Sequence, residues 1–300
     1  MDEITSALCR KLDLRVIEAL TAGNICDAVY RVATRESTLK ILKVGNTPRT
    51  MTEIHNNLVG YAKIQRLGLP HFIPDIYSSR DFESFAYILM EDCGLDFVAR
   101  TRTESDPINL YLQLVTAMKS IYHKTMHPSQ CAKESVLRVA TKARGQYLTY
   151  LSHFDPDGIM RDPLDRMIGW AQHLHAPLAT FSSWDFTPED VYLTADGVKY
   201  ADPHEDVVGV PIIDLACFGG VVRDAYELPG AIEGYQLLHK LALEYVGPLL
   251  EISREDAERI FNMGRVLQCF LSARFRRESD PDKAKHLFSQ GERILAQVVS

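Results

Sequence analysis

The chain has 300 residues, 46% of them hydrophobic, which is enough for two lobes that each bury a core. A formal net charge of −7 argues against binding to a nucleic-acid backbone, and no apolar run approaches the roughly 20 residues of a membrane-spanning helix. The N-terminus has no secretory-signal pattern, and six dispersed cysteines without metal-like spacing indicate reduced thiols. We therefore expect a cytoplasmic protein without nucleic-acid or membrane partners.

The first ninety or so residues have the pattern of a strand-rich segment with one inserted helix. Short runs rich in β-branched and aromatic residues predict strands over 15–20, 28–34, 38–44, 76–79 and 85–91. Apolar residues at helical spacing predict a helix over 50–67, which ends at Gly68 with Pro70 beyond it. The strand pattern stops at Asp92-Cys93-Gly94, so we predict a small lobe over residues 1–93.

The remainder, residues 94–300, is predicted to form a larger and mainly helical lobe. A long amphipathic helix begins near Pro107, and further helices are predicted over 133–151, 163–174, 230–245, 254–277 and 282–299. The exception is 191–201, where an Asp196-Gly197 turn predicts a β-hairpin. The fold class is therefore α+β, with a small β-rich lobe and a large helical lobe.

Three carboxylates border this hairpin. Asp185 and Asp190 precede it, and Asp202 follows it. Phosphoryl transfer uses such a set, because one carboxylate orients and deprotonates the attacking hydroxyl while others hold Mg²⁺ on the phosphates. In this interpretation Asp185 is the catalytic base, and Asp190 and Asp202 are metal ligands. Aspartates also cap helices, make turns and end strands, so spacing alone leaves both interpretations open.

The order of these residues resembles that of the aminoglycoside phosphotransferase and choline kinase group of small-molecule kinases. The catalytic loop of that group, His-Gly-Asp-x-x-x-x-Asn, is similar to residues 183–190 of this chain. Its metal-binding aspartate matches Asp202, and a later Asp-Leu-Ala that stabilises the loop matches residues 214–216. The resemblance covers nearly the whole chain in order, and it implies a two-lobed, protein-kinase-like fold.

The resemblance also implies a nucleotide site in the small lobe. Lys43 matches the third-strand lysine that holds the nucleotide phosphates, and Glu53 matches its partner on the following helix. Residues 88–94 look like the hinge strand whose backbone meets adenine, and the turn over 21–27 would cover the phosphates. The residues so assigned to the nucleotide are Lys43, Glu53, Gly23, Asn24, Met90, Glu91 and Cys93.

The activity implied by the resemblance is Mg²⁺-dependent transfer of the γ-phosphoryl group of ATP or GTP to a hydroxyl of a small molecule. Only eleven residues separate Asp202 from Asp214, and no Ala-Pro-Glu follows, which favours a small acceptor over a peptide. Asp206, Asp224 and Glu227 would favour a cationic or sugar-like acceptor such as an aminoglycoside. The acceptor, the choice between ATP and GTP, and the oligomeric state do not follow from the sequence.

Three residues depart from the pattern of the group: Ser183 replaces histidine, Trp184 replaces glycine, and Asp190 replaces asparagine. Together with the glycine-poor turn over 21–27, they support an alternative hypothesis. The chain would then be a kinase-like nucleotide-binding or regulatory protein with weakened turnover. Retention of Lys43, Asp185 and Asp202 favours the enzyme.

Overall fold

The computed structural model describes residues 3–20, 27–82, 84–128, 131–154, 161–183 and 186–298. The chain divides into two compact units, the first formed by Met1–Gly94 with Thr194–Glu205 and the second by Leu95–Leu193 with Asp206–Ser300. The sequence analysis instead divides the chain once, after residue 93. The difference arises because Thr194–Glu205 returns to the first unit, where it contacts the sheet and its helix.

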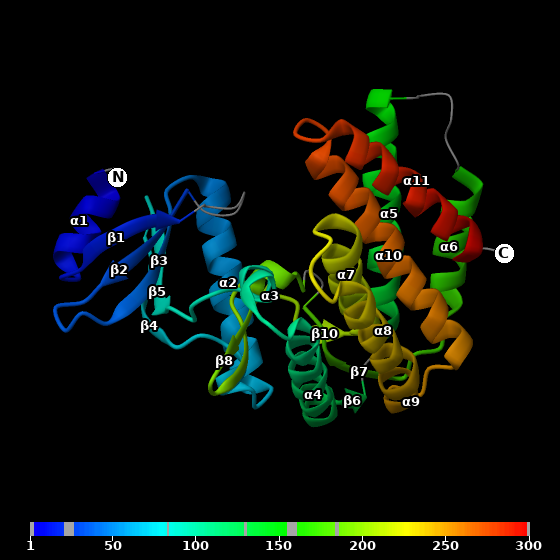
Figure 1. The fold of residues 1–300 in the computed structure, drawn as a ribbon, viewed down its shortest axis with the longest axis horizontal. Coiled ribbons are helices and arrows are strands. Elements are labelled where there is room, and N and C mark those ends of the chain that lie inside the picture. The colour runs from blue at the N-terminus through cyan, green and yellow to red at the C-terminus, as the bar shows by residue number, and fades with distance from the viewer. Residues whose placement is uncertain are drawn as a thin grey trace. The chain divides into compact units, whose positions relative to one another are not determined.

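The first unit contains a five-stranded antiparallel sheet in the order β1-β2-β3-β5-β4 (Figure 1). Its strands are β1 Arg15–Leu20, β2 Ala28–Ala33, β3 Leu39–Gly45, β4 Ile76–Asp81 and β5 Ala86–Glu91. Two helices accompany the sheet, α1 Glu3–Lys11 and α2 Pro48–Arg66, and a 3₁₀ turn follows at Pro70–Phe72. The five predicted strands and the inserted helix are confirmed, whereas α1 was not predicted.

The alternation of side chains along β3 divides the first unit into two layers. Leu42 and Val44 belong to a core cluster that includes Leu8 and Cys9 of α1. Because successive side chains of a strand point to opposite faces, Lys43 lies on the other face of the sheet. That face carries the interactions with residues 199–205 described below.

The start of α2 is held by hydrogen bonds among short polar side chains. Thr47 and Thr50 form a reciprocal capping box, with Pro48 in the first turn. Asp27 accepts hydrogen bonds from the backbone N–H groups of Asn46 and Thr47, at 2.6 and 3.1 Å, and from the Thr50 hydroxyl. These contacts fix the connection between β3 and α2.

The second unit is mainly helical and contains, besides its helices, a three-stranded sheet of short strands in the order β10-β7-β6 (Figure 1). Its helices are α3 Phe97–Thr103, α4 Pro107–Thr125, α5 Cys131–Phe154, α6 Arg161–His173, α7 Ile212–Gly220, α8 Ala231–Leu241, α9 Gly247–Leu249, α10 Arg254–Arg276 and α11 Pro281–Val298. Its remaining regular segments are β6 His127–Pro128, β7 Leu178–Phe181, the 3₁₀ turn Pro188–Asp190, β10 Val208–Gly209 and the π-helical segments Val221–Ala225 and Ala242–Val246.

The predicted hairpin is also present, as β8 Val191–Thr194 and β9 Gly197–Tyr200, and the boundary between the units passes through it. In the second unit, α10 packs against α5, α7 and α11, and it forms the centre of the helical core. None of the helices within the described ranges has the length and apolar character that crossing a membrane requires.

Candidate functional site

Strand β3 and the segment after β9 bring Lys43 and Asp202 together within the first unit. The Lys43 Nζ is 3.2 Å from the Asp202 Oδ1 and 3.4 Å from the Ala201 carbonyl oxygen. The two side chains are only 12% and 13% exposed, and 159 residues separate them in the sequence. The structure thus pairs the residue predicted to hold phosphates with a residue predicted to hold the metal.

Asp202 is placed by backbone contacts on either side of it. Tyr61 of α2 donates its hydroxyl to the Ala201 carbonyl oxygen, and the Asn57 amide donates to the Pro203 carbonyl oxygen at 3.2 Å. A Cβ on Gly60 would lie 2.8 Å from that same Pro203 oxygen, so this face of α2 needs a glycine for the close approach. Helix α2 therefore positions Asp202 as well as covering the sheet.

Glu53 does not pair with Lys43, contrary to the role the resemblance assigned to it. It is half-buried and makes no hydrogen bond or ion pair with any described residue, whereas Lys43 pairs with Asp202. The next residue, Ile54, is fully buried, and one residue corresponds to a rotation of about 100° around a helix. The packing of Ile54 therefore leaves Glu53 at the edge of the buried face, and its contact with the nucleotide site stays a prediction.

The predicted hinge residues lie at the end of β5. Met90 is buried, with its sulfur 3.6 Å from the Tyr61 hydroxyl oxygen. Glu91 forms an ion pair with Lys199 of β9 and exchanges hydrogen bonds with the backbone of Asp75. Burial, together with the charge of Glu91, raises the pKa of the Cys93 thiol to about 12. These contacts make the strand end rigid, and its contact with an adenine ring stays a prediction.

The first half of the predicted catalytic loop is anchored by a buried carboxylate. The Ser183 backbone N–H donates to Asp214 Oδ2 at 2.9 Å, and Asp214 is only 2% exposed. The loop-stabilising role predicted for Asp214 is thereby confirmed. The Ser183 hydroxyl is buried and has no hydrogen-bond partner within the described part of the chain. Trp184 and Asp185 lie outside the described residues, as do Gly23 and Asn24, so their predicted roles stay predictions.

The second half of the loop is anchored by packing and by a local turn. Phe186 is 1% exposed, and its ring centroid is 5.5 Å from that of Phe218 on α7. Thr187 donates its hydroxyl to Asp190 Oδ2 at 2.6 Å, while the Asp190 N–H donates to the Thr187 carbonyl oxygen at 3.2 Å. Asp190 is half-buried at the end of this turn, in the second unit.

The carboxylates available for Mg²⁺ have the donor chemistry that this ion prefers. Within the described ranges, no three His, Cys, Asp or Glu side chains are grouped as a ready-made metal site. Mg²⁺ sites do not require such a group, because one or two carboxylates, phosphate oxygens and waters commonly complete the coordination. Asp190 and Asp202 fit that requirement by chemical type, and their role as ligands stays a prediction.

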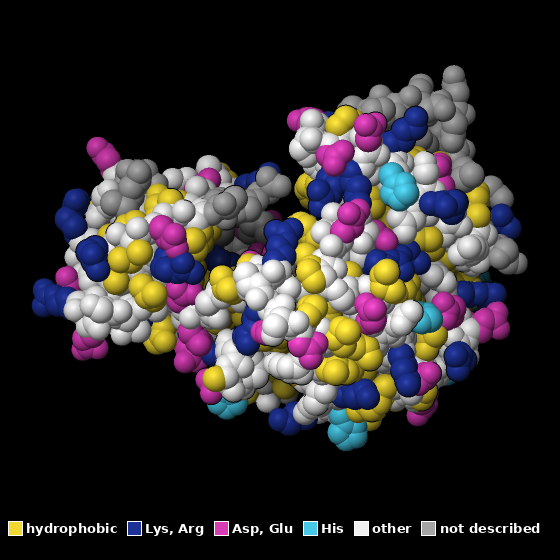
Figure 2. Space-filling view, viewed as in Figure 1, with side chains coloured by type: hydrophobic (Ala, Val, Ile, Leu, Met, Phe, Trp, Pro, Cys, Tyr) yellow, Lys and Arg dark blue, Asp and Glu magenta, His cyan; other side chains and the backbone are white. Residues whose placement is uncertain are grey.

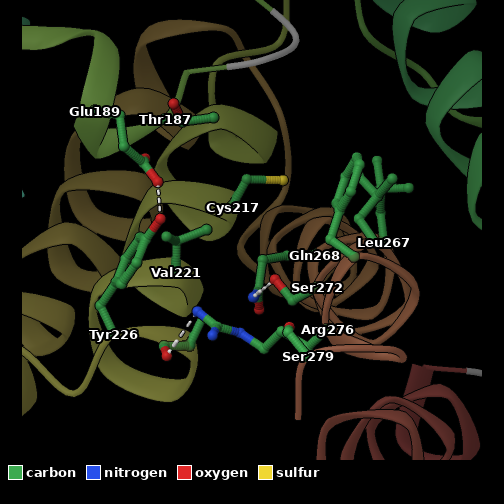
Figure 3. A pocket seen from close by; sticks show the side chains of 13 residues that line it. Thr187, Glu189, Cys217, Val221, Tyr226, Leu267, Gln268, Ser272, Arg276 and Ser279 are labelled. Atoms are coloured by element: carbon green, nitrogen blue, oxygen red, sulfur yellow. Dashed lines mark hydrogen bonds between the residues drawn. The ribbon is translucent and has the colours of Figure 1, made fainter. Parts of the chain in front are cut away.

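A cavity of about 440 Å³ lies in the second unit and was not predicted (Figure 3). Its walls come from Thr187 and Glu189, from α7, from the π-helical segment Val221–Ala225 and from the C-terminal half of α10. The sequence carries one partial signal, because Leu271 and Phe275 form an apolar i, i+4 pair on a helix end that is otherwise rich in arginine. The cavity itself needs segments that are far apart in the chain.

Polar side chains in the cavity wall hydrogen-bond to their neighbours, as Figure 3 shows. Tyr226 donates its hydroxyl to the Glu189 carboxylate, and the pKa of Tyr226 is raised by burial and by this hydrogen bond. Gln268 donates its amide to the Ser272 hydroxyl at 2.9 Å, and Arg276 donates to the Ala225 carbonyl oxygen at 3.0 Å. These polar side chains of the wall are therefore held in place by hydrogen bonds within the protein.

No family model matches the sequence, and no curated protein is similar to it by sequence comparison. Solved structures do match across the chain. A choline kinase from Streptococcus pneumoniae aligns at 14% identity over 99% of this chain and 100% of its own, with a TM-score of 0.61. An amicoumacin kinase in complex with AMP-PNP, Ca²⁺ and Ami aligns at 13% identity over 99% and 94%, with a TM-score of 0.58.

A type VIII aminoglycoside-3′-phosphotransferase aligns at 13% identity over 88% of this chain and 98% of its own, with a TM-score of 0.53. At these identities the comparison establishes the fold. The chain has the protein-kinase-like fold of the aminoglycoside phosphotransferase and choline kinase group, as the order of its sequence motifs predicted. Its β-rich N-terminal part and helical C-terminal part correspond to the predicted α+β class.

Proposed function

We propose that the protein is a small-molecule kinase that transfers the γ-phosphoryl group of a Mg²⁺-bound nucleoside triphosphate to an acceptor hydroxyl. The observation that carries this proposal is the Lys43–Asp202 pair at 3.2 Å. In this pair, Lys43 provides a cation for phosphate oxygens, and Asp202 provides an oxygen ligand for a metal. The matching fold and the Asp214–Ser183 hydrogen bond at the loop support the same activity.

The proposed reaction assigns each sequence-predicted residue one task. The acceptor oxygen forms a bond to the γ-phosphorus, and the bond from that phosphorus to the β,γ-bridging oxygen breaks. The nucleoside diphosphate leaves with the bonding electron pair, and the hydroxyl proton passes to the Asp185 carboxylate. Lys43 holds the phosphates, while Asp190 and Asp202 hold Mg²⁺, which supplies charge neutralisation when bound.

The alternative is a kinase-like nucleotide-binding or regulatory protein with weakened turnover. It is favoured by one specific observation: the hydroxyl of Ser183, at the position of the histidine in the similar kinases, has no hydrogen-bond partner among the described residues. The Ser183 side chain thus makes no hydrogen bond to the described part of the loop, whereas a histidine at this position could supply one. In this case Mg²⁺-nucleotide would bind through Lys43 and Asp202 without transfer to any alcohol.

Lys43→Met and Asp202→Asn should each lower the affinity for Mg²⁺-ATP or Mg²⁺-GTP at least about tenfold, or ~1.4 kcal/mol. The physical reason is the loss of a phosphate-binding cation in one variant and of a metal-binding charge in the other. Isothermal titration calorimetry with and without Mg²⁺ measures both effects, and the Asp202→Asn effect should require Mg²⁺. Lys40→Met is a matched control, because Lys40 lies on the same strand and its cation contacts the Tyr77 ring.

Wild-type affinity in Lys43→Met would exclude the proposed nucleotide site.

Turnover separates the two candidate functions. An enzyme consumes nucleoside triphosphate in an acceptor-dependent way that Asp185→Ala abolishes. A regulatory protein binds Mg²⁺-nucleotide with Lys43-dependent affinity, and its acceptor-dependent rate equals that of Asp185→Ala.

A further inference from the structure

The cavity of the second unit adjoins the catalytic loop. Thr187 and Glu189 line it, and they follow the predicted base Asp185 by two and four residues. An acceptor bound at this end of the cavity would therefore contact the segment that follows the predicted base in the sequence.

The walls of this cavity are mostly apolar. Leu267, Leu271 and Phe275 of α10 face it together with Val221 and Ala225 of the π-helical segment. Polar side chains of the wall form hydrogen bonds with one another, as in the Tyr226–Glu189 and Gln268–Ser272 pairs. Such a lining favours a ligand with a large apolar part and only a few polar groups.

The charges in the lining cancel. Glu189 and Arg276 are the two charged residues of the wall, and they have opposite signs. Glu189 accepts a hydrogen bond from Tyr226 through Oε1, while its Oε2 is buried and has no hydrogen-bond partner among the residues that the structure describes. The wall can thus compensate one donor group or one ammonium, but it has no further carboxylate for a second.

The acidic residues that the sequence suggested for a cationic acceptor are already paired with basic side chains. Asp206 pairs with Arg138 and Glu227 with Lys283. Asp224 lies 2.7 Å from Arg223 and 3.4 Å from Arg265. Acidic and basic side chains are also interspersed over the face of this unit shown in Figure 2, without an acidic patch that would attract a polycation.

We propose that this cavity receives the acceptor, and that it selects an uncharged or singly charged alcohol with a large apolar part over a polycation such as an aminoglycoside. The inference rests on the proposed kinase function. Its physical basis is that each additional ammonium would lose its hydration in an apolar cavity without gaining a counter-charge. The sequence-based expectation of an aminoglycoside-like acceptor is therefore replaced by that of an amphipathic alcohol.

Cys217 of α7 lines the cavity, and Figure 3 shows its side chain among the others of the wall. Its thiol can therefore be labelled to test which groups the cavity accepts. Three methanethiosulfonates would be reacted with the intact protein: one carries a neutral benzyl group, one a singly charged trimethylammonioethyl group, and one a dicationic group with two quaternary ammonium centres. Peptide mass spectrometry gives the labelling rate at Cys217, and division by the rate with free cysteine removes intrinsic reactivity. The normalised rates of the neutral and the singly charged reagent should each exceed that of the dicationic reagent at least tenfold.

Equal or faster labelling by the dicationic reagent would overturn the inference, because it would show that the cavity accepts more than one positive charge. Failure of all three reagents to label Cys217 in the folded protein would overturn it as well, because the cavity would then be closed to ligands. Cys217→Ser confirms the assignment of the labelled peptide, and the other cysteines are resolved by their own peptides.

A cavity-filling variant connects this chemistry to turnover. Leu271→Trp should reduce acceptor-dependent phosphoryl transfer at least tenfold across a panel of uncharged alcohols while leaving the affinity for Mg²⁺-nucleotide unchanged. Leu112→Trp, a matched change at a 46% exposed position on α4, should leave both unchanged. Phosphorylation of kanamycin at equal rates in wild type and Leu271→Trp would overturn the cavity inference and leave the kinase proposal standing. Loss of the proposed nucleotide site would instead be seen in the Lys43→Met titration.

Discussion

Ser183 and Asp214 show how the loop is built at the scale of single residues. The buried Asp214 carboxylate accepts the Ser183 N–H, so the backbone donor is satisfied. The Ser183 side chain lies in the same buried site, yet its hydroxyl has no hydrogen-bond partner in the described ranges. Burial of a hydroxyl without a hydrogen bond is unfavourable, so the loop retains a group that lowers its stability.

Ser183→Ala should raise the free energy of unfolding by about 1 kcal/mol, because it removes an unpaired buried hydroxyl. Ser135→Ala is the matched control. The Ser135 hydroxyl is equally buried, but it donates to the Ala132 carbonyl oxygen and accepts from the Val210 N–H at 3.2 Å. That substitution should lower stability by about 1–3 kcal/mol, since it leaves a buried N–H without a partner. Urea unfolding curves of the three proteins measure both changes, and a similar loss in both variants would contradict the assignment.

At the scale of elements, helix packing decides whether replacing a helical glycine with alanine stabilises or destabilises the protein. Gly234 of α8 lies against the Tyr111 ring of α4, and a Cβ there would lie 2.7 Å from the ring Cγ. Gly145 of α5 is exposed, and a Cβ there would meet nothing within 4 Å. The two glycines have the same helix propensity but different surroundings.

Gly145→Ala should stabilise the protein by about 0.5–1 kcal/mol, because alanine restricts the unfolded chain and favours the helix. Gly234→Ala should destabilise it by about 1–3 kcal/mol, because the methyl group overpacks the α4–α8 contact. Thermal and urea unfolding test the opposite signs. A stabilising effect of Gly234→Ala would show that α4 and α8 are not packed as closely as described.

The elements also show where sequence patterns succeed. Helices α2, α10 and α11 were predicted because each alternates buried and exposed residues at helical spacing. Helix α7 was missed because nearly all of Ile212–Gly220 is buried, so no polar face produces a periodic signal. Strand β7 has only four residues and, unlike the equally short β8 and β9, has no Asp-Gly turn beside it. Local pattern thus identified the long amphipathic helices and missed a helix that is buried on nearly all sides.

At the scale of the whole molecule, each unit contains an aspartate whose pKa is lowered. For Asp27 in the first unit, burial raises the pKa, but hydrogen bonds from Asn46, Thr50 and Thr47 outweigh it. For Asp224 in the second unit, burial likewise raises the pKa, and the bonds and charges of its arginine partners lower it by more. A carboxyl group with a lowered folded-state pKa adds stability above its unfolded pKa and loses that contribution as the pH falls through the folded value.

Asp224→Asn should lower the free energy of unfolding near neutral pH by on the order of 3 kcal/mol, because two partly buried arginines lose their counter-charge. The difference from wild type should begin to shrink near pH 3.9, the ordinary aspartate pKa, where Asp224 of the unfolded chain binds a proton. It should disappear below the lowered folded-state pKa, where native Asp224 is protonated as well. Tryptophan fluorescence during urea unfolding is a suitable measurement, because Trp170 lies on α6 of the second unit. An equal difference at neutral and acidic pH would show that the ion pair is not the cause.

The sequence by itself determined the α+β class, the strands of the first unit, the long amphipathic helices, and the order of Lys43, Asp202 and Asp214. These features follow from periodicity and spacing along the chain, which depend on near neighbours. Only the tertiary structure decided that Lys43 pairs with Asp202 rather than Glu53, because 159 residues separate that pair. It likewise decided that Asp206 and Glu227 are neutralised by partners 68 and 56 residues away, and that apolar side chains from three segments enclose one cavity. The charge and shape of a site depend on which residues far apart in the sequence are in contact, and the pattern along the sequence does not identify these contacts.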